Sequence, residues 1–349
     1  MPSTLDALLP KFKVAQLKQL AFLCGAKNSG RKAELVERLL TLAQLPASKK
    51  KPLILSIDMG IRNLGYSLLS PAVSSPGRKK KSAPLTGEAL RSPPRIDLHA
   101  WQRRELFDAS PDEPIDPDQY SPTSLASAAD RLIRQDLLPL KPTHVLIERQ
   151  RWRSGGASTI FEWTVRVNTL EAMLHASLRT LRELGHWDGE IISIAPPSIT
   201  RFWPAPPEDV VPKRRSRASK VTEGEGKLRK GTNPMQSKKH KIGVLTGWLK
   251  MGPKDQVILP GNSDIEGAVE QFRRKLSGVR KSRSRTAEDG LAREAWPRKL
   301  DDLTDCLLQG VAWLKWEENK ALLLDEKRIA ELLDSDILDE EIDTSLDDV

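Results

Sequence analysis

LILSIDMG, residues 53–60, is the stretch that decides the fold of this sequence. It is a continuous apolar run of the length of one buried strand, and it ends in Asp58 and Gly60. GYSLLS follows at residues 65–70, which predicts a hairpin partner for that strand. The pair predicts the centre of a sheet with an acidic residue at the end of its first strand.

The elements after this hairpin predict a mixed sheet with helices on its faces. Further strands are expected at residues 95–104, 144–148 (HVLIE) and 191–195 (IISIA), the last closed by Pro196 and Pro197. Helical periodicity predicts helices over residues 124–137, 161–184, 238–250 and 300–316. Strands that first lie adjacent and then alternate with helices indicate an α/β fold.

Acidic residues occur where a sheet-based phosphoryl-transfer enzyme needs them. Asp58 and Glu148 end two apolar strands, and Asp301, Asp302 and Asp305 lie in the first turns of the last helix, in KLDDLTDCLLQG. Positions three or four apart share a helix face, so Asp305 pairs with either of the other two aspartates. Clustered carboxylates repel one another unless cations lie between them, and Mg²⁺ prefers oxygen ligands. The pattern predicts a metal site for phosphodiester hydrolysis, with two ions about 4 Å apart.

Each acidic residue taken singly has an ordinary structural explanation. Asp58 also suits a strand-end turn, Glu148 an ion pair with Arg149 or Arg151, and Asp301 a helix N-cap. Asp-x-Gly after a buried strand also occurs in actin-like ATPases, but the Gly-rich nucleotide loops that those enzymes need late in the chain do not occur here. The acidic sites together favour a metal site and no nucleotide cofactor.

A run of cations follows Glu148 directly. Arg149, Arg151 and Arg153 suit the phosphates that flank a cleaved bond. Trp152 suits stacking on an opened base, worth about 1–3 kcal/mol per base. The alternative is that an arginine pairs with a neighbouring acid and that Trp152 belongs to the core.

The charge balance favours a polyanionic partner. Lys and Arg number 56 against 47 Asp and Glu, a formal net charge of +9, which favours salt-sensitive association with nucleic acid. Basic insertions are predicted as exposed loops at 71–94, 204–237 and 273–289, and an acidic tail at 317–349. From Asp334 onwards this tail is expected either to be disordered or to compete with DNA for the basic loops. Lys238, Lys239 and Lys241 are the predicted contacts near a scissile phosphate.

Residues 1–45 predict a small helical unit, joined to the rest by a polar, basic linker at 46–52. A first helix is expected up to Gly25, and a second from near Ser29. Two cations, Arg31 and Lys32, stand beside the start of the second helix, and with Ser29 they suit phosphate oxygens. The alternative is a helical hairpin that only docks on the main domain.

The cysteine content and the hydropathy of the sequence indicate a protein of a reducing compartment without a membrane span. The two cysteines, Cys24 and Cys306, both lie in apolar helical patterns, so neither a disulfide scaffold nor a cysteine zinc site is expected. No apolar run approaches the roughly 18 residues of a membrane span. The start, MPSTLDALLPKFK, has neither a signal-peptide core nor a clear transit peptide.

Four motifs resemble one family, the fungal mitochondrial cruciform-cutting endonucleases, which are ribonuclease H-like relatives of bacterial RuvC. The motifs, spread over about residues 50–317, are SIDMGIRNLGYS, IERQRWRS, ISIAPPSITRFW and KLDDLTDCLLQGVAWL. The segment LKQLAFLCGAKNSGRKAELVERL resembles a SAP motif, a short helix–turn–helix DNA-binding unit. The resemblance implies a ribonuclease H-like domain at 53–316 behind a SAP-like unit at 1–45.

The resemblance also implies a Holliday junction resolvase of mitochondria. Such an enzyme is a homodimer that binds a four-way DNA junction and makes two symmetric nicks with Mg²⁺ or Mn²⁺. By motif position, Asp58, Glu148 and Asp305 carry over as metal ligands, together with Asp301, Asp302 or both. The spacing from Asp302 to Asp305 matches the Asp-x-x-Asp of RuvC-type enzymes. Alternatives are a nuclease of the same fold for another substrate, such as an RNA–DNA hybrid, and a non-catalytic junction binder.

Overall fold

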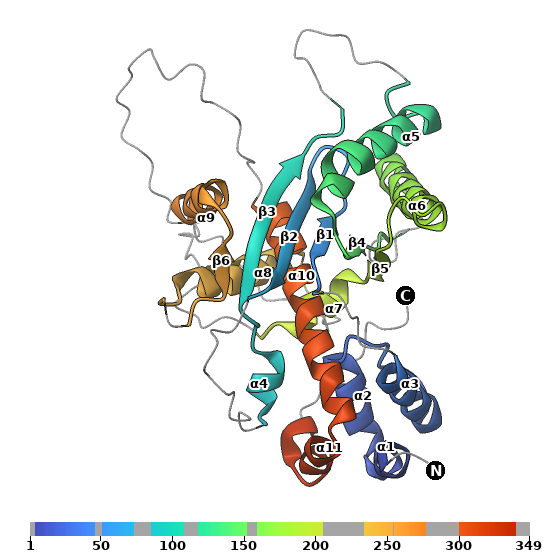
Figure 1. Cartoon of the computed structure of the whole chain (residues 1–349), viewed down its shortest axis with the longest axis vertical. Coiled ribbons are helices and arrows are strands. Elements are labelled where there is room, and N and C mark those ends of the chain that lie inside the picture. The colour runs from blue at the N-terminus through green and yellow to red at the C-terminus, as the bar shows by residue number, and fades with distance from the viewer. Residues whose placement is uncertain are drawn as a thin grey trace, which may run out of the picture.

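A six-stranded mixed sheet, in the order β5-β4-β1-β2-β3-β6, forms the centre of the computed structural model (Figure 1). The structure describes residues 4–45, 51–72, 85–107, 118–151, 159–204, 234–253, 255–276 and 300–339. The strands are β1 (Ile54–Asp58), β2 (Leu64–Pro71), β3 (Ile96–Arg104), β4 (His144–Glu148), β5 (Glu190–Ile194) and β6 (Ile258–Pro260).

The middle of the sheet is the predicted hairpin. β1 and β2 pair antiparallel with Ile57 opposite Tyr66, and β2 pairs antiparallel with β3. β4 lies parallel to β1, and β5 lies parallel to β4. Every residue of β1 is buried, as expected for a strand covered on both faces. The prediction of a mixed α/β sheet flanked by helices is confirmed.

Helices cover both faces of this sheet and form a separate core on each. Successive strand residues point to opposite faces, so Ile54 joins one core and Leu55 the other. The face of Leu55 is covered by α5 (Pro122–Arg131), its π- and 3₁₀-helical continuations η2 (Leu132–Leu137) and η3 (Leu138–Leu140), and α6 (Glu162–Glu183). The face of Ile54 is covered by α7 (Pro196–Phe202), α8 (Pro234–Lys250), α9 (Ser263–Leu276) and α10 (Asp301–Lys320).

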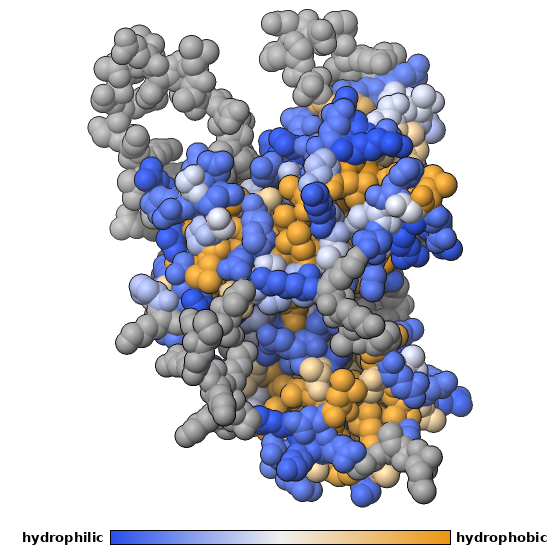
Figure 2. Space-filling model, viewed as in Figure 1, coloured by the Kyte–Doolittle hydropathy of each residue, from blue (hydrophilic) through white to orange (hydrophobic). Residues whose placement is uncertain are grey.

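Short helices at the two chain ends pack together around the last turns of α10 (Figure 1). The N-terminal unit, residues 4–45, consists of α1 (Thr4–Leu8), η1 (Leu9–Lys11), α2 (Val14–Leu23) and α3 (Lys32–Gln44). It meets α4 (Gly87–Arg91), η5 (Ala321–Leu324), α11 (Glu326–Leu333) and η6 (Asp336–Leu338). In the same view, apolar residues gather on the surface over these helices (Figure 2).

The prediction of an acidic tail is wrong for residues 317–339. These residues complete α10 and then form η5, α11 and η6. Leu323, Ile329, Leu332 and Leu338 are buried there. Acidic residues are frequent in this stretch. The apolar residues between them nevertheless recur at helical spacing and are buried in the core. Residues 340–349 lie outside the described part of the chain.

The sequence predicted no strand or helix between the helix ending at Lys250 and residue 300, but β6 and α9 lie there. Ile265, Val269 and Phe272 recur at helical spacing and are buried, and the ring of Phe272 packs 4.9 Å from that of Trp101. The cations at 273–275 therefore form the last turn of α9 and no loop. Residues 277–299 lie outside the described ranges.

Several boundaries differ from those predicted. The second N-terminal helix begins at Lys32 instead of near Ser29, and α8 begins four residues earlier than expected, at Pro234. Pro196 and Pro197 follow the end of β5 at Ile194, as expected, and they also begin α7, because proline is tolerated in the first turn of a helix. Within the insertion expected at 71–94, residues 87–91 form α4, and most of the one at 204–237 lies outside the described residues.

Candidate active site

Two acidic side chains lie at neighbouring strand ends. β1 and β4 run parallel with Ile57 opposite Ile147, so the next residues, Asp58 and Glu148, emerge at the same edge of the sheet. Asp58 is only 8% exposed, and Glu148 is half-buried. The strand ends therefore place two carboxylates side by side, as the sequence predicted.

The first turns of α10 reach the same edge of the sheet. Gly65 of β2 packs against the helix so closely that a Cβ there would lie 2.5 Å from the carbonyl oxygen of Asp302. Gln309 fixes the helix from the other side, because its buried amide donates to Ser56 Oγ (3.1 Å) and to the carbonyl oxygen of Ile57 (3.2 Å). The close approach of α10 to β1 and β2 thus depends on Gly65 and on the buried amide of Gln309.

The carboxylates of the three elements influence one another. Burial raises the pKa of Asp58 well above its usual range, and the negative charges of Glu148, Asp305 and Asp302 raise it further. Burial also raises the pKa of Asp305 to about 6, although the ammonium of Lys241 opposes that rise. Burial and mutual repulsion destabilise the ionised form of these carboxyl groups. A cation bound between them would stabilise that form.

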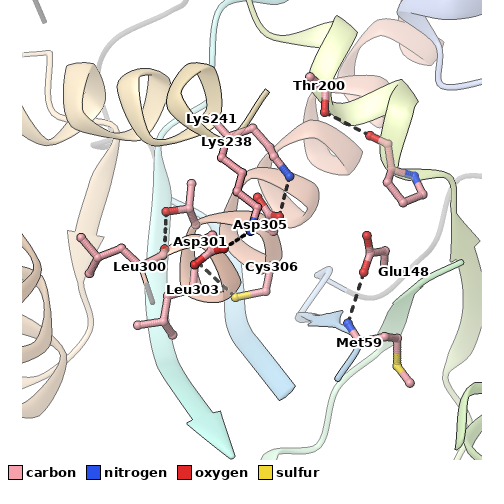
Figure 3. A network of polar contacts seen from close by, with 12 residues as sticks. Met59, Glu148, Thr200, Lys238, Lys241, Leu300, Asp301, Leu303, Asp305 and Cys306 are labelled. Atoms are coloured by element: carbon pink, nitrogen blue, oxygen red, sulfur yellow. Dashed lines mark hydrogen bonds and ion pairs between the residues drawn. The ribbon is translucent and has the colours of Figure 1, made fainter. Parts of the chain in front are cut away.

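Two lysines of α8 face these aspartates (Figure 3). The Nζ of Lys238 lies 2.5 Å from Asp301 Oδ2, and the Nζ of Lys241 lies 2.5 Å from Asp305 Oδ2. The contact with Asp301 raises the pKa of Lys238. The Lys241 pair is the better shielded, at 17% and 22% exposure against 59% for Lys238, so solvent screens it less. Lys239, between them, is exposed.

Glu148 is held by donors that sequence reasoning missed. Its Oε2 accepts from the backbone N–H of Met59 (3.3 Å) and from the amide of Gln150 (3.0 Å). The backbone N–H of Gln150 donates in turn to Glu171 of α6 (2.9 Å). Gln150 stands between two arginines in IERQRWRS, but its hydrogen-bond partner could not be predicted from the spacing of the motif.

The carboxylate oxygens at this edge suit a hard divalent cation, although the described side chains are not already arranged around a common metal position. Asp305 Oδ1 is buried and accepts no hydrogen bond within the described part of the chain. Carboxylate oxygens are the ligands that Mg²⁺ and Mn²⁺ prefer. Among the described residues, however, no three His, Cys, Asp or Glu side chains already form a metal-binding group. Ligation of one cation by three of these carboxylates therefore requires side chains to move closer together, while Lys241 contacts the other oxygen of Asp305.

The predicted DNA contacts fall in two separate places. Arg149 and Arg151 are exposed just beyond the end of β4, beside the acidic edge. Ser29, Arg31 and Lys32 lie before and at the start of α3, in the N-terminal unit, and the structure does not bring them to that edge. The predicted residues Trp152 and Arg153 lie outside the described residues.

The sheet order and the acidic edge define a class: a ribonuclease H-like α/β protein with carboxylates gathered at β1, β4 and the start of α10. Residues 54–323 match the family described as mitochondrial resolvase Ydc2 / RNA splicing MRS1, and residues 9–43 match the SAP domain. The chain belongs to this mitochondrial resolvase family. The resemblance predicted from the four motifs and from the SAP-like segment is confirmed.

Individual relatives agree with this membership. The mitochondrial cruciform cutting endonuclease 1 of Schizosaccharomyces pombe is 30% identical over 196 residues, which cover 55% of this chain and 66%, just under two thirds, of that protein. The protein of the same name from Saccharomyces cerevisiae is 24% identical over 96% of this chain and 88% of its own length. The crystal structure of the yeast mitochondrial Holliday junction resolvase Ydc2 superposes with a TM-score of 0.55 at 23% identity, covering 91% of this chain and 98% of that one.

The family and the names of both curated relatives confirm the mitochondrial location. Within the described ranges, no helix combines the length and the apolar character needed to cross a membrane.

Proposed function

We propose that this protein is a Holliday junction resolvase, a metal-dependent endonuclease that nicks four-way DNA junctions in pairs of symmetric cuts. The observation that carries the proposal is the convergence of Asp58, Glu148 and Asp305, which are far apart in the sequence, at one sheet edge in a chain of the resolvase family. Two nicks in one junction require two such sites, so we propose that the active form is a homodimer.

The proposed ligands of two Mg²⁺ or Mn²⁺ ions are Asp58, Glu148, Asp305 and one further aspartate of α10. Asp302 is the better choice for the fourth ligand, because its charge acts on Asp58 and its backbone lies against Gly65 at the start of β2. Asp301 is instead paired with Lys238, whose side chain is 59% exposed. We therefore assign Asp301 to holding Lys238.

Bound Mg²⁺ ions would supply charge neutralisation on the phosphate and activation of the attacking water. The protein's own groups orient the reaction. The donors on Glu148 fix that carboxylate, and Lys241, once released from Asp305, is placed to neutralise a phosphate oxygen. Arg149 and Arg151 lie where flanking phosphates would be gripped. A bond forms between the water oxygen and phosphorus while the water loses a proton. A backbone P–O bond breaks, and the leaving sugar oxygen takes up a proton, so that the strand is nicked.

A nucleic-acid binder without cleavage is the main rival, since the family description also names RNA splicing. Carboxylates that face the phosphates of bound nucleic acid weaken that binding by charge repulsion, unless metal cations lie between the two groups. Their presence at the sheet edge therefore supports the nuclease. A nuclease acting on RNA–DNA hybrids remains the second rival and is separated by substrate choice.

The test compares substrates and variants in one assay. Purified protein with Mg²⁺ is expected to cut a synthetic four-way junction far faster than a linear duplex or an RNA–DNA hybrid of the same sequence. Asp58→Asn should keep junction binding but lose cleavage by about 100-fold or more. Asp130→Asn, a matched change in an exposed ion pair on α5, should change neither. Equal cutting of junction and duplex, or cleavage by Asp58→Asn, would refute the proposal.

A further inference from the structure

The N-terminal unit and the acidic edge lie at opposite ends of one helix. α10 is 20 residues long, which corresponds to about 30 Å at 1.5 Å per residue. It begins with the aspartates of the proposed active site and ends against α2 and α11 (Figure 1). A single straight element therefore spans the distance between the two regions.

The last turns of α10 hold the N-terminal unit by close contacts. Gly25, at φ +69°, lies against the ring of Trp316, and a Cβ there would come within 2.4 Å of it. Asn319 is 2% exposed, and its amide donates to the carbonyl oxygens of Leu23 (2.8 Å) and Leu90 (3.0 Å). Buried hydrogen bonds of this kind fix orientation, because no water can replace a lost partner.

A chain of aromatic rings makes a second connection, from α2 through α7 to α8. The ring centroids of Phe22 and Phe202 lie 6.0 Å apart, and those of Phe202 and Trp316 lie 5.7 Å apart. Trp203 then packs at 4.8 Å on Trp248 of α8, the helix that carries the lysines of the site. The motif ISIAPPSITRFW thus supplies the joint between the N-terminal unit and the catalytic body.

The hydrophobic core is continuous across this joint. Buried residues of the N-terminal unit, such as Leu20 and Leu35, belong to the same cluster as Leu308 and Trp316 of α10. A module swinging on a linker would have its own separate core. The N-terminal unit is therefore part of the rigid body that carries the acidic edge.

We infer that the N-terminal unit is a fixed arm, which contacts the backbone of a duplex arm of the junction at a set distance from the cut. This inference rests on the proposed function. The proposed contact is the turn before α3, where Arg31 and Lys32 are exposed. Arg38 holds this turn in place by donating hydrogen bonds to the carbonyl oxygens of Lys27 and Ser29. The helix length of about 30 Å sets the scale of this distance, and 30 Å corresponds to about nine base pairs at 3.4 Å per pair.

The test is a series of junctions whose four arms are shortened from about 20 to six base pairs. Dissociation constants are measured in EDTA with the full chain. Wild type should bind equally well down to about nine base pairs and then lose about tenfold within two or three pairs, as two phosphate contacts are lost. The variant with Arg31→Glu and Lys32→Glu should bind long arms as weakly as wild type binds short ones, with no step.

Controls keep the outcome interpretable. Arg179→Glu with Lys327→Glu makes the same charge change on exposed residues of α6 and α11 and should keep the step. Acidic residues at the start of α3 agree with the helix dipole, so the turn variant should fold. Asn319→Leu should spread the loss of affinity over a wider range of arm lengths, while its thermal unfolding stays cooperative. If this variant does not fold, the result with Arg31→Glu and Lys32→Glu decides the test.

A gradual loss of affinity with arm length, or a step that survives in the turn variant, would overturn the fixed arm. Cleavage of long-armed junctions by wild type with Mg²⁺ is scored in parallel. Cleavage without a step refutes only the fixed arm, whereas a step without cleavage refutes the resolvase proposal and leaves the fixed arm standing.

Discussion

Replacing Asp305 with asparagine should stabilise the metal-free protein at neutral pH. The pKa of this carboxyl is raised from 3.8 to about 6, so the folded state disfavours its ionised form. The stability associated with the protonated group is fully present below pH 3.8 and is lost as the pH rises through 6. At 1.36 kcal/mol per pKa unit the loss is about 3 kcal/mol. The side chain keeps 22% exposure, so we expect about 1–2 kcal/mol after solvent screening.

Urea and thermal unfolding of wild type and Asp305→Asn, each in EDTA at pH 7.5 and at pH 5, test this expectation. The variant should melt a few degrees higher at pH 7.5, and the difference should shrink at pH 5, where wild-type Asp305 is largely protonated. Millimolar Mg²⁺ should raise the melting temperature of wild type only, because a ligand that binds the native state stabilises it. A variant less stable than wild type at pH 7.5 would show that Asp305 serves mainly as a structural partner of Lys241, and the reasoning would fail.

Three other changes probe the same edge. Lys241→Gln removes the ammonium that faces Asp305 and should lower the cleavage rate at least about tenfold with a smaller effect on junction affinity; an unchanged rate would exclude a role for this lysine. Gly65→Ala would push the first turn of α10 off β2 and should reduce both cleavage and Mg²⁺-dependent stabilisation, measured by gel assay and thermal shift; full activity would show that the close approach is dispensable. Removal of divalent cations by EDTA should abolish cleavage and leave junction binding, and Mg²⁺ or Mn²⁺ should restore it; cleavage that persists in EDTA would exclude a metal-dependent reaction.

The hairpin and the two strand-end carboxylates could be predicted because their signals are local. An apolar run of strand length that stops at an acidic residue identifies both the strand and its end, as at Asp58 and Glu148. Parallel neighbours then bring the two ends to one edge without further information. The candidate site follows from topology alone up to this point.

The counter-charges and the packing of the chain ends could not be predicted, because they depend on tertiary contacts. Lys238 and Lys241 were recognised as cations, but their pairing with Asp301 and Asp305 depends on how α8 crosses α10. In the stretch 317–339, acidic residues between the apolar positions made a packed helical segment look like a solvated tail. The docking of the N-terminal unit depends on Trp316 and Asn319, whose partners lie nearly 300 residues away.

α10 explains how the protein tolerates an edge of mutually repelling carboxylates. The helix presents Asp302 and Asp305 from its first turns, while Leu307, Leu308 and Val311 immediately behind them are fully buried against the sheet. Each such side chain contributes about 1.5–3 kcal/mol on burial, so the three together outweigh the cost of about 1–2 kcal/mol assigned above to an ionised Asp305. The same rigid burial continues to the N-terminal unit, so the helix that holds the acidic edge in place also sets its distance from the second proposed DNA contact. Loosening α10 should therefore weaken cleavage and arm recognition together, whereas changes at either end should affect only one of them.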